Sequence, residues 1–429
     1  MVRVGFNIME LSVKAWGKTI GKIVEHNGKN LFALSPNIDL RFSPIQLKKT
    51  NKLYDFSHLA FQHGLPGLIN DSLPGQYGQE YLNDFFVQHF KYHPSVVETL
   101  QFIGDNTMGV LTYEPTILSE HDGDGVVLQA KELYEQTKMA LNGKAELSLA
   151  KIIAISNSTA SGARPKALVG LNKQSKEIFV GKKGENIPDG FIHSIIKFDN
   201  LIYGTNHGMA TPYKEEKISK TITEHIFALL AQKCDIAMPK TSLIETDGGV
   251  HFAVERFDIK NTLSGVEHLH MHSLSGLMHH NPAETTFDYM NAFRVGLKLN
   301  VPHEDMVNLY RIMIFNVVFG NKDDHSRNIS YLMDKNGMWR AAPAYDLTFT
   351  YNKHHQMLFN FRNISEIDRK HIIKIGEEFK IHTCDEIISQ VIDVKHTFLT
   401  EFAVQYGVER WAKDVIVLTS HVDRALKDS

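Results

Sequence analysis

A chain of 429 residues is long enough for two or three domains and a large core, and 43% hydrophobic with 22% charged residues is an ordinary composition for a soluble protein. The net charge of −3 at pH 7 excludes a molecule that binds nucleic acid through its overall charge alone. The sequence has no run of about 18 apolar residues and no signal-peptide core at its amino terminus, and the two cysteines, Cys234 and Cys384, exclude a disulfide scaffold, so we expect a cytoplasmic protein without a membrane span.

The first region, residues 1–120, combines a small sheet with helices. Short apolar runs from residue 4 to about residue 34, broken by two sets of turn residues, predict a small antiparallel sheet. Helical spacing of apolar residues follows at 80–86 and at 96–102. This region contains no constellation that indicates catalysis.

The second region, residues 121–257, begins as strand, loop and strand. Strands are predicted at 152–155 and 167–171, and the loop between them consists of small residues that let the backbone approach a phosphate closely. Arg164 or Lys166 could supply positive charge there. Taken alone, the loop is better explained as an ordinary surface loop, because it holds a single glycine.

The strand predicted at 191–198 ends near Lys197. This residue occupies the position of the lysine that holds the α- and β-phosphates of ATP in protein kinases, although a lysine at a strand end usually reaches solvent. A helix predicted at 215–232 could steady that lysine through Glu224. Because Glu224 lies opposite the apolar stripe of the helix, a solvated surface glutamate explains it at least as well.

The third region, residues 258–429, has the pattern of a helical domain. Helices are predicted at 287–299 and from Pro302 to a C-cap at Gly320, and further amphipathic helices follow from residue 364 to the end of the chain. The long apolar helix that ends at Gly320 would give rigid support to the segment that follows it.

A hairpin is predicted directly after this helix. The pair Asn336-Gly337 is the strongest two-residue hairpin signal, and it separates an alternating run at 329–333 from a returning strand at 338–341. The first residue of one strand lies near the last of the other in an antiparallel hairpin, so residues on either side of this hairpin should be neighbours.

Three polar residues flank the hairpin in the order found in protein kinases. Asp323 precedes Asn328 by five residues, and Asp346 follows the second strand, so Asn328 and Asp346 should lie close together. Phosphoryl transfer needs a carboxylate to orient the attacking hydroxyl and hard oxygen ligands to hold Mg²⁺ against the phosphates. Any one of these residues alone marks a turn, but their combination indicates a phosphotransfer site.

At these residues the sequence resembles the HipA family of bacterial toxin kinases, the serine/threonine kinases of type II toxin–antitoxin modules, over nearly the whole chain. The motifs that carry the resemblance are Leu34-Ser35-Pro36, Asp71-Ser72-Leu73-Pro74-Gly75, Met108-Gly109, Gly162-Ala163-Arg164-Pro165-Lys166-Ala167, Glu255-Arg256-Phe257-Asp258, Gly320 to Asn328 and Ala342-Pro343-Ala344-Tyr345-Asp346-Leu347.

The resemblance implies an α+β protein with a two-lobed, protein-kinase-like fold. A strand-rich N-terminal part would carry an extra small β subdomain, and the C-terminal lobe would be all-helical. The domains would then be a HipA N-terminal-type subdomain at 1–120, a kinase N-lobe with the phosphate loop and the ATP lysine at 121–257, and a C-lobe with the catalytic loop and the metal-binding motif at 258–429.

The resemblance also implies roles for individual residues. Asp323 would be the catalytic acid/base, and Asn328 and Asp346 would be the Mg²⁺ ligands. The residues that would bind ATP are Gly162, Ala163, Arg164 and Lys166 of the phosphate loop, the ATP lysine Lys197, the hinge residues Glu255 and Phe257, and His325 and Arg327 of the catalytic loop. Arg327 stands where the family usually has lysine, which preserves the charge but not the geometry.

Family members inhibit themselves by phosphorylating a serine of the phosphate loop. The matching position here is Thr159, with Ser158 and Ser161 beside it, so three hydroxyls are candidates. A phosphate there would repel ATP from the loop. The resemblance further implies a HipB-like helix-turn-helix antitoxin as partner, contact with DNA only through that antitoxin, and a protein substrate, since studied family substrates are aminoacyl-tRNA synthetases.

Three functions therefore remain open. The first is an active ATP- and Mg²⁺-dependent protein kinase that arrests growth. The second is a small-molecule phosphotransferase of related fold, which would share Asp323, Asn328 and Asp346. The third is a catalytically silent partner and corepressor for the antitoxin, which would have no physical need to keep these three residues together with Lys197.

Overall fold

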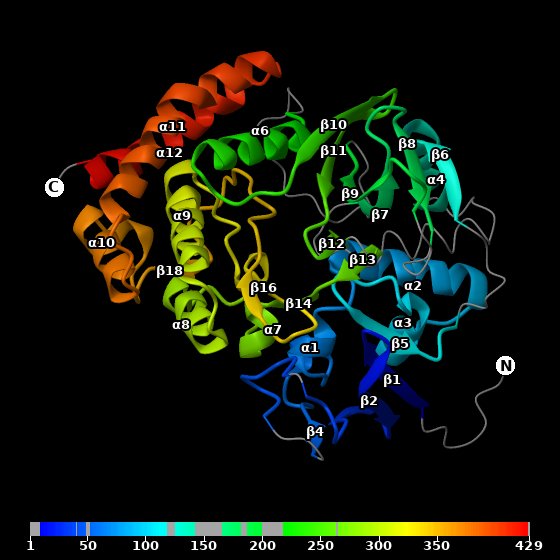
Figure 1. Cartoon of the computed structure of the whole chain (residues 1–429). Coiled ribbons are helices and arrows are strands. Elements are labelled where there is room, and N and C mark those ends of the chain that lie inside the picture. Colours follow the sequence, from blue (N-terminus) through cyan, green and yellow to red (C-terminus); the bar gives the residue numbers. More distant parts are fainter. Residues whose placement is uncertain are drawn as a thin grey trace.

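The computed structural model describes residues 9–39, 41–48, 52–117, 125–141, 165–181, 187–199, 218–262 and 265–427 (Figure 1). The first part is a five-stranded antiparallel sheet with the strand order β4-β3-β2-β1-β5. Its strands are β1 (Met9–Ala15), β2 (Lys18–His26), β3 (Lys29–Leu34), β4 (Leu53–Asp55) and β5 (Leu111–Glu114). The sheet predicted for this region is confirmed from residue 9 onwards.

Tight turns join the first three strands. Trp16 and Gly17 have φ angles of 47° and 75°, and Asn27 and Gly28 have φ angles of 50° and 73°, as two-residue hairpins require. The helices of this part are α1 (Gly67–Asn70), α2 (Gln76–Phe90) and α3 (Val96–Ile103). Both predicted longer helices are therefore present, and Ser95 begins α3 with a capping box.

The second part is a six-stranded sheet with the order β10-β11-β9-β7-β8-β6. Its strands are β6 (Val126–Gln129), β7 (Lys166–Leu171), β8 (Glu177–Val180), β9 (Ile192–Lys197), β10 (Thr241–Thr246) and β11 (Gly249–Glu255). The helices α4 (Ala130–Leu141) and α6 (Lys220–Lys233) belong to this part. The strands predicted at 167–171 and 191–198 are confirmed, whereas the strand predicted at 152–155 lies outside the described residues.

The third part is mainly helical and occupies the left of Figure 1. Its helices are α7 (Leu274–Met278), α8 (Tyr289–Leu299), α9 (His303–Phe319), α10 (Arg369–Glu378), α11 (Cys384–Gln405) and α12 (Glu409–Lys427). Short strands lie among them: β12 (Ile259–Thr262), β13 (Gly265–His268), β14 (His270–Ser273), β15 (Phe287–Asp288), β16 (Ser330–Met333), β17 (Trp339–Ala341) and β18 (Met357–Leu358). Among the described residues, no helix combines the length and apolarity that crossing a membrane requires.

The hydrophobic core shows how these parts are joined. The larger cluster of buried residues runs from the first sheet through α6 to the C-terminal helices, and includes Leu11, Phe227, Phe315 and Leu426. The six-stranded sheet has a smaller core of its own, built around residues such as Ile196. The first sheet therefore packs as one unit with the helical part.

A buried ion pair joins the last two helices. The Nζ atom of Lys395 in α11 lies 2.8 Å and 2.9 Å from the two carboxylate oxygens of Asp423 in α12, and it also donates to Thr419 at 2.5 Å. The Lys395 side chain is fully buried, and burial lowers its pKa although Asp423 raises it. Removing only the carboxylate would leave a buried ammonium without its counter-charge.

We expect Asp423→Ala to lower the free energy of unfolding by about 3–5 kcal/mol for this reason. The measurement is urea unfolding followed by circular dichroism. Glu401→Gln, at an exposed position of α11, is the matched control and should change stability by less than about 0.5 kcal/mol. Equal stability of the two variants would show that the ion pair is not important for the helix packing.

Candidate active site

The predicted hairpin is present and is attached to both ends of α9. Strands β16 and β17 pair antiparallel, and Gly337 in the turn has a φ of 84°. At the end of α9, Gly320 adopts a φ of 68° and its N–H bonds to the carbonyl of Asn316, as predicted for a C-cap. At the start of α9, the Asp305 carboxylate accepts hydrogen bonds from the Arg340 guanidinium at 2.7 Å and from the Ala341 N–H at 2.9 Å.

The hairpin brings the segments of Asn328 and Asp346 together. The hydroxyl of Tyr345, the residue before Asp346, donates to the carbonyl of Arg327, the residue before Asn328, at 2.6 Å. The same hydroxyl lies 2.6 Å from Ser330 Oγ. Local pairing and this tyrosine therefore hold the two candidate metal ligands on adjoining segments.

The neighbouring carboxylates of Asp323 and Asp324 lie in different environments. Asp324 is 2% exposed, and it accepts hydrogen bonds from Tyr289 Oη at 3.0 Å, from His355 Nδ1 at 2.7 Å and from the Gln356 N–H at 2.8 Å. Asp323 is only partly buried, and its Oδ1 accepts one hydrogen bond, from Gln356 Nε2 at 2.7 Å. Of the two, Asp323 is the carboxylate that can meet a substrate hydroxyl.

Lys197 joins the six-stranded sheet to the hairpin segment. Its Nζ lies 2.5 Å from Glu224 Oε1 in α6 and forms a second ion pair with Asp346. Glu224 and Lys197 are buried, whereas the Asp346 side chain is 31% exposed. The geometry is that of a lysine held between a helix glutamate and the acid that follows the hairpin.

The ion pair of Glu224 is a feature that sequence reasoning did not assign. Glu224 lies opposite the apolar stripe of α6, which favours a solvated side chain in a helix with one buried face. In the structure α6 packs against β10 and β11 and also against α11, so both of its faces are covered. The polar residues Thr221, Thr223 and His225 around Glu224 are buried as well, so the sequence of this helix does not show that its polar face is covered.

Two lysines approach Asp346. Lys166 in β7 and Lys197 in β9 are register partners, so their side chains leave the same face of the sheet. Burial raises the pKa of Asp346, but the charges of Lys197 and Lys166 and the Lys197 hydrogen bond lower it further, and its pKa lies well below the usual carboxyl range. Asp346 therefore stays ionised at neutral pH, and its φ of 52° is a left-handed conformation that aspartate tolerates.

The oxygen atoms near the hairpin suit a hard cation. Asn328 Nδ2 donates to the carbonyl of Asp323 at 2.8 Å. The side-chain oxygen of Asn328 is therefore the atom that can coordinate a cation. Asp346 supplies an ionised carboxylate on the adjoining segment. An amide oxygen and a carboxylate are ligand types that Mg²⁺ prefers, so the residues fit this metal.

The other predicted catalytic-loop residues differ in their contacts. His325 is partly buried and its Nδ1 has no hydrogen-bond partner within the described structure, and its charge also lowers the pKa of Asp346. Arg327 donates from Nη2 to the carbonyl of Asn70 at 3.5 Å, which directs it toward the first part of the chain.

The predicted hinge residues lie where β11 leaves the sheet. Glu255 forms an ion pair with Lys173 at 2.8 Å, and the ring of Phe257 lies 5.5 Å from that of Tyr345. Asp258 accepts hydrogen bonds from the Arg256 guanidinium and, at 2.6 Å, from the N–H of Gly109. The remaining predicted site residues lie outside the described residues: Ser158, Thr159, Ser161, Gly162, Ala163 and Arg164.

The Asp71 motif contacts the part of the chain that supports the catalytic loop. The Asp71 carboxylate accepts hydrogen bonds from the Ser273 N–H at 2.7 Å and from Ser273 Oγ at 2.6 Å, and it lies 2.6 Å from His272 Nδ1. The Nε2 atom of His272 lies 3.0 Å from Ser43 Oγ. These contacts begin α7, and His280 just after α7 bonds to Ser326 of the catalytic loop at 2.9 Å.

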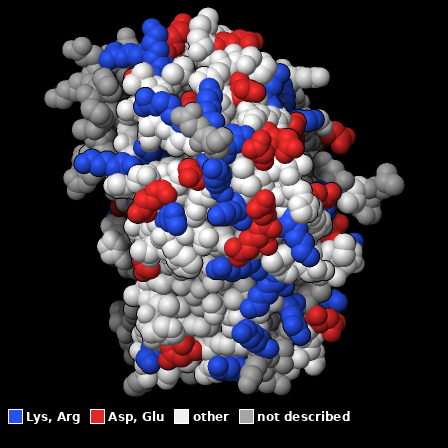
Figure 2. Space-filling view, turned by 90° about the vertical axis from the view of Figure 1, so that its left-hand side faces the viewer, with Lys and Arg blue, Asp and Glu red and all other residues white. Residues whose placement is uncertain are grey.

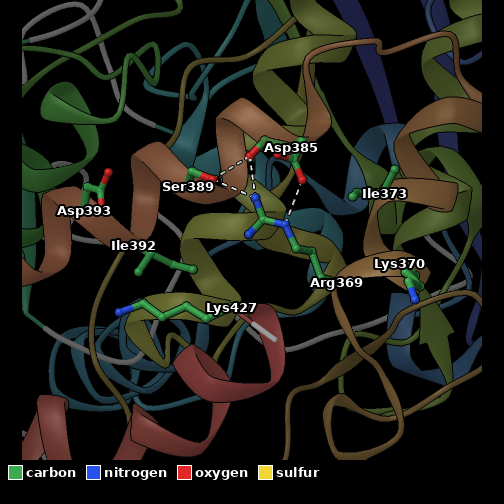
Figure 3. Close-up of a pocket in the computed structure, with 8 residues that line it drawn as sticks. All are labelled: Arg369, Lys370, Ile373, Asp385, Ser389, Ile392, Asp393 and Lys427. Atoms are coloured by element: carbon green, nitrogen blue, oxygen red, sulfur yellow. Dashed lines mark hydrogen bonds and ion pairs between the residues drawn. The ribbon is translucent and has the colours of Figure 1, made fainter. Parts of the chain in front are cut away.

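Figure 3 shows a pocket of about 530 Å³ between α10, α11 and α12. Arg369 projects into it and donates to Asp385 Oδ1 at 2.7 Å, to Ser389 Oγ at 2.6 Å and to the carbonyl of Leu426 at 2.7 Å. The guanidinium is therefore used to join the three helices, and we assign the pocket no ligand.

Comparison with known proteins supplies a family. The family model of the HipA-like C-terminal domain matches residues 158–398, more than half of the 429 residues. A chain of the complex of HipA, HipB and operator DNA from Shewanella oneidensis MR-1 aligns with a TM-score of 0.67 at 14% identity, over 98% of this chain and 100% of that chain. The Helicobacter pylori proinflammatory kinase CtkA aligns with a TM-score of 0.34 at 9% identity, over 56% of this chain and 93% of that chain. No curated protein matches the chain. The likeness to the Shewanella chain confirms the predicted α+β, protein-kinase-like fold. The C-terminal lobe is not all-helical as predicted, because the short strands β12 to β18 lie among its helices.

We expect Asp71→Asn to lower the free energy of unfolding by about 1–3 kcal/mol, because buried donors of His272 and Ser273 lose an ionised acceptor. Burial raises the pKa of Asp71, but the hydrogen bond and charge of His272 lower it further, so the net pKa is below the usual value. This stabilisation is present above about pH 4 and is lost as the pH falls through the lowered pKa.

The measurement is urea unfolding of wild type and variant at pH 7 and at successively lower pH values. The difference in unfolding free energy should narrow below about pH 4. Asp39→Asn, at an exposed position, is the control for loss of one carboxylate. A difference that stays constant with pH would contradict the proposed ionised state of Asp71.

Proposed function

We propose, from the premise that this chain belongs to the HipA family, that it is a HipA-like toxin with ATP- and Mg²⁺-dependent serine/threonine protein kinase activity. The observation that carries the proposal is the convergence at the hairpin: Lys197, paired with Glu224 and Asp346, lies on one side, and the partly exposed Asp323 precedes Asn328 on the other. A protein that did not transfer phosphate would have no evident use for these charged side chains in one place.

Asp323 would act as the catalytic acid/base. One of its oxygens is bound by Gln356, and the carboxylate would orient a substrate hydroxyl and take its proton as the phosphoryl group is transferred. Asn328 and Asp346 would hold Mg²⁺. The metal, when bound, neutralises charge on the phosphate oxygens.

Lys197 and Lys166 would bind the phosphates of ATP. Both are buried, and their adjacent positions on β7 and β9 concentrate two positive charges on one face. Glu224 would keep Lys197 in place when Asp346 turns to the metal. The other nucleotide contacts would come from Gly162, Ala163 and Arg164 of the phosphate loop, from Glu255 and Phe257 at the hinge, and from His325 and Arg327.

Regulation would act through the phosphate loop and a protein partner. Phosphorylation of Thr159, Ser158 or Ser161 would place a charge of about −1.5 to −2 in the loop and repel ATP. The Shewanella relative is in a complex with HipB and operator DNA, which supports a HipB-like helix-turn-helix antitoxin as the partner here. Figure 2 shows Lys and Arg interspersed with Asp and Glu over the face of the C-terminal helices. Mixed charge of this kind does not favour direct binding of DNA by this face, so contact with DNA would come through the antitoxin.

The cellular outcome would be arrest of growth by phosphorylation of a cytoplasmic protein, and the family substrates suggest an aminoacyl-tRNA synthetase. The three predicted domains, 1–120, 121–257 and 258–429, would serve as support, nucleotide-binding lobe and catalytic lobe. The extensive core shared by the first sheet and the helices supports this use of the first domain.

Intact-mass spectrometry after incubation with ATP and Mg²⁺ tests the proposal. We expect wild type to gain phosphoryl groups in the loop, and Asp323→Asn to transfer phosphate about 10²–10⁴-fold more slowly while remaining folded. Asp393→Asn, at an exposed position of α11, is the matched control.

Each alternative function predicts a different result. Turnover of ATP only with free sugars, antibiotics or lipids would favour a small-molecule phosphotransferase. Absence of transfer to the chain or to added protein would favour the silent antitoxin partner. Unchanged activity of Asp323→Asn would remove this residue from its role.

We expect Asp346→Ala to lose the Mg²⁺ dependence of ATP binding, because the ionised carboxylate near Asn328 is removed. Calorimetric titration with ATP, with and without Mg²⁺, measures this effect. Asp247→Ala, with an 80% exposed side chain, is the control. If Mg²⁺ increased the ATP affinity of Asp346→Ala as much as that of wild type, the metal assignment would be wrong.

A further inference from the structure

The Asp323 carboxylate is oriented by a residue from a distant part of the chain. The side-chain amide of Gln356, 33 residues further on, donates from Nε2 to Asp323 Oδ1 at 2.7 Å. Gln356 is partly buried, and it stands immediately before β18. A neutral N–H donor that bonds an ionised oxygen favours one orientation of the carboxylate plane.

The position of Gln356 is itself determined by Asp324, the acid next to Asp323 in the sequence. The main-chain N–H of Gln356 donates to Asp324 Oδ1 at 2.8 Å, and Nδ1 of the preceding His355 lies 2.7 Å from Asp324 Oδ2. The backbone at residues 355 and 356 is therefore bound to the buried Asp324, while the Gln356 side chain reaches the adjacent Asp323.

Asp324 is in turn held by the helices. Its Oδ2 accepts from Tyr289 Oη in α8 at 3.0 Å, and that hydroxyl accepts from Asn316 Nδ2 in α9 at 2.9 Å. Asn321 Nδ2 donates to Asn316 Oδ1 at 2.9 Å, which returns the network to the catalytic loop. The residues of this hydrogen-bond network, from Asp324 to Asn321, are all buried. The network therefore holds the backbone at Gln356 rigidly.

We propose that Gln356 is a positioning residue for phosphotransfer, which binds Oδ1 of Asp323 so that Oδ2 is presented to the substrate hydroxyl. The inference rests on the proposed function and assigns the two adjacent acids separate tasks. Asp324 anchors the backbone of residues 355 and 356, and Asp323 meets the substrate. Gln356 contacts neither ATP nor metal in this scheme, so its loss should affect the chemical step and not nucleotide binding.

Gln356→Ala is the informative variant, because it removes the side-chain donor and keeps the main-chain N–H that binds Asp324. We expect kcat for protein phosphorylation to fall about 10- to 100-fold with the KM for ATP and the melting temperature unchanged. Gln356→Glu keeps the size of the side chain but replaces the donor with a carboxylate facing Asp323. We therefore expect kcat to fall further in this variant than in Gln356→Ala. His354→Ala, an exposed position two residues earlier, is the control and should behave as wild type.

The outcomes separate the two proposals. An inactive wild type would contradict the proposed kinase function. An active wild type with an equally active Gln356→Ala would overturn the positioning role, and so would a variant that changes only the KM for ATP or the melting temperature. Restored activity in Gln356→Glu would also count against it, because an ionised carboxylate has no proton to donate to Asp323.

The hydrogen bond can be tested without activity. In protein labelled with ¹⁵N at glutamine side chains, the Gln356 amide protons should exchange slowly with solvent in wild type and faster in Asp323→Ala. The remaining glutamine side chains serve as internal references. Equal exchange of the Gln356 amide in both proteins would show that Asp323 does not hold it.

Discussion

The ion pairs of Lys197 connect two parts of the protein that have separate hydrophobic cores. The six-stranded sheet has its own core around Ile196, whereas the hairpin belongs to the core that the helices share. Lys197 reaches from the end of β9 to Glu224 in α6 and to Asp346 after the hairpin. A buried lysine needs counter-charges, and Lys197 finds one in each of these two elements, so its ion pairs link the sheet to the segment after the hairpin.

The first part of the chain supports the loop that holds Ser326, although the two are far apart in the sequence. Asp71 bonds the start of α7, and the end of α7 reaches Ser326 in the catalytic loop. A Cβ atom added at Gly67 would lie 2.1 Å from the carbonyl oxygen of Gly276, so α1 and α7 approach as closely as backbones can. The candidate catalytic loop therefore rests on a layer that includes residues from the first 75 positions.

Burial assigns different tasks to carboxylates of the same chemistry. Asp324 is enclosed and accepts three hydrogen bonds, so it is structural. Asp323 is only partly buried and accepts a hydrogen bond from Gln356, and Asp346 faces two lysines that keep it ionised. The residue type is identical in each case, and only the number of donors and the access to solvent distinguish the acid that can react from the acid that supports it.

The sequence by itself determined the local elements and the order of the candidate catalytic residues. Turn chemistry at Asn336-Gly337 and the apolar period of the helix that ends at Gly320 are local signals, and the hairpin and the helix that they predict are both present. The connection between the paired strands spans 334–338, however, and is longer than the predicted two residues. The tertiary structure alone decided the partner of Glu224 and the contact of Gln356 with Asp323. Glu224 is buried where α6 packs on the six-stranded sheet and meets Lys197, and Gln356 lies 33 residues from Asp323 in an irregular segment. Neither contact leaves a periodic or turn signal, since each depends on packing between elements that are distant in the chain.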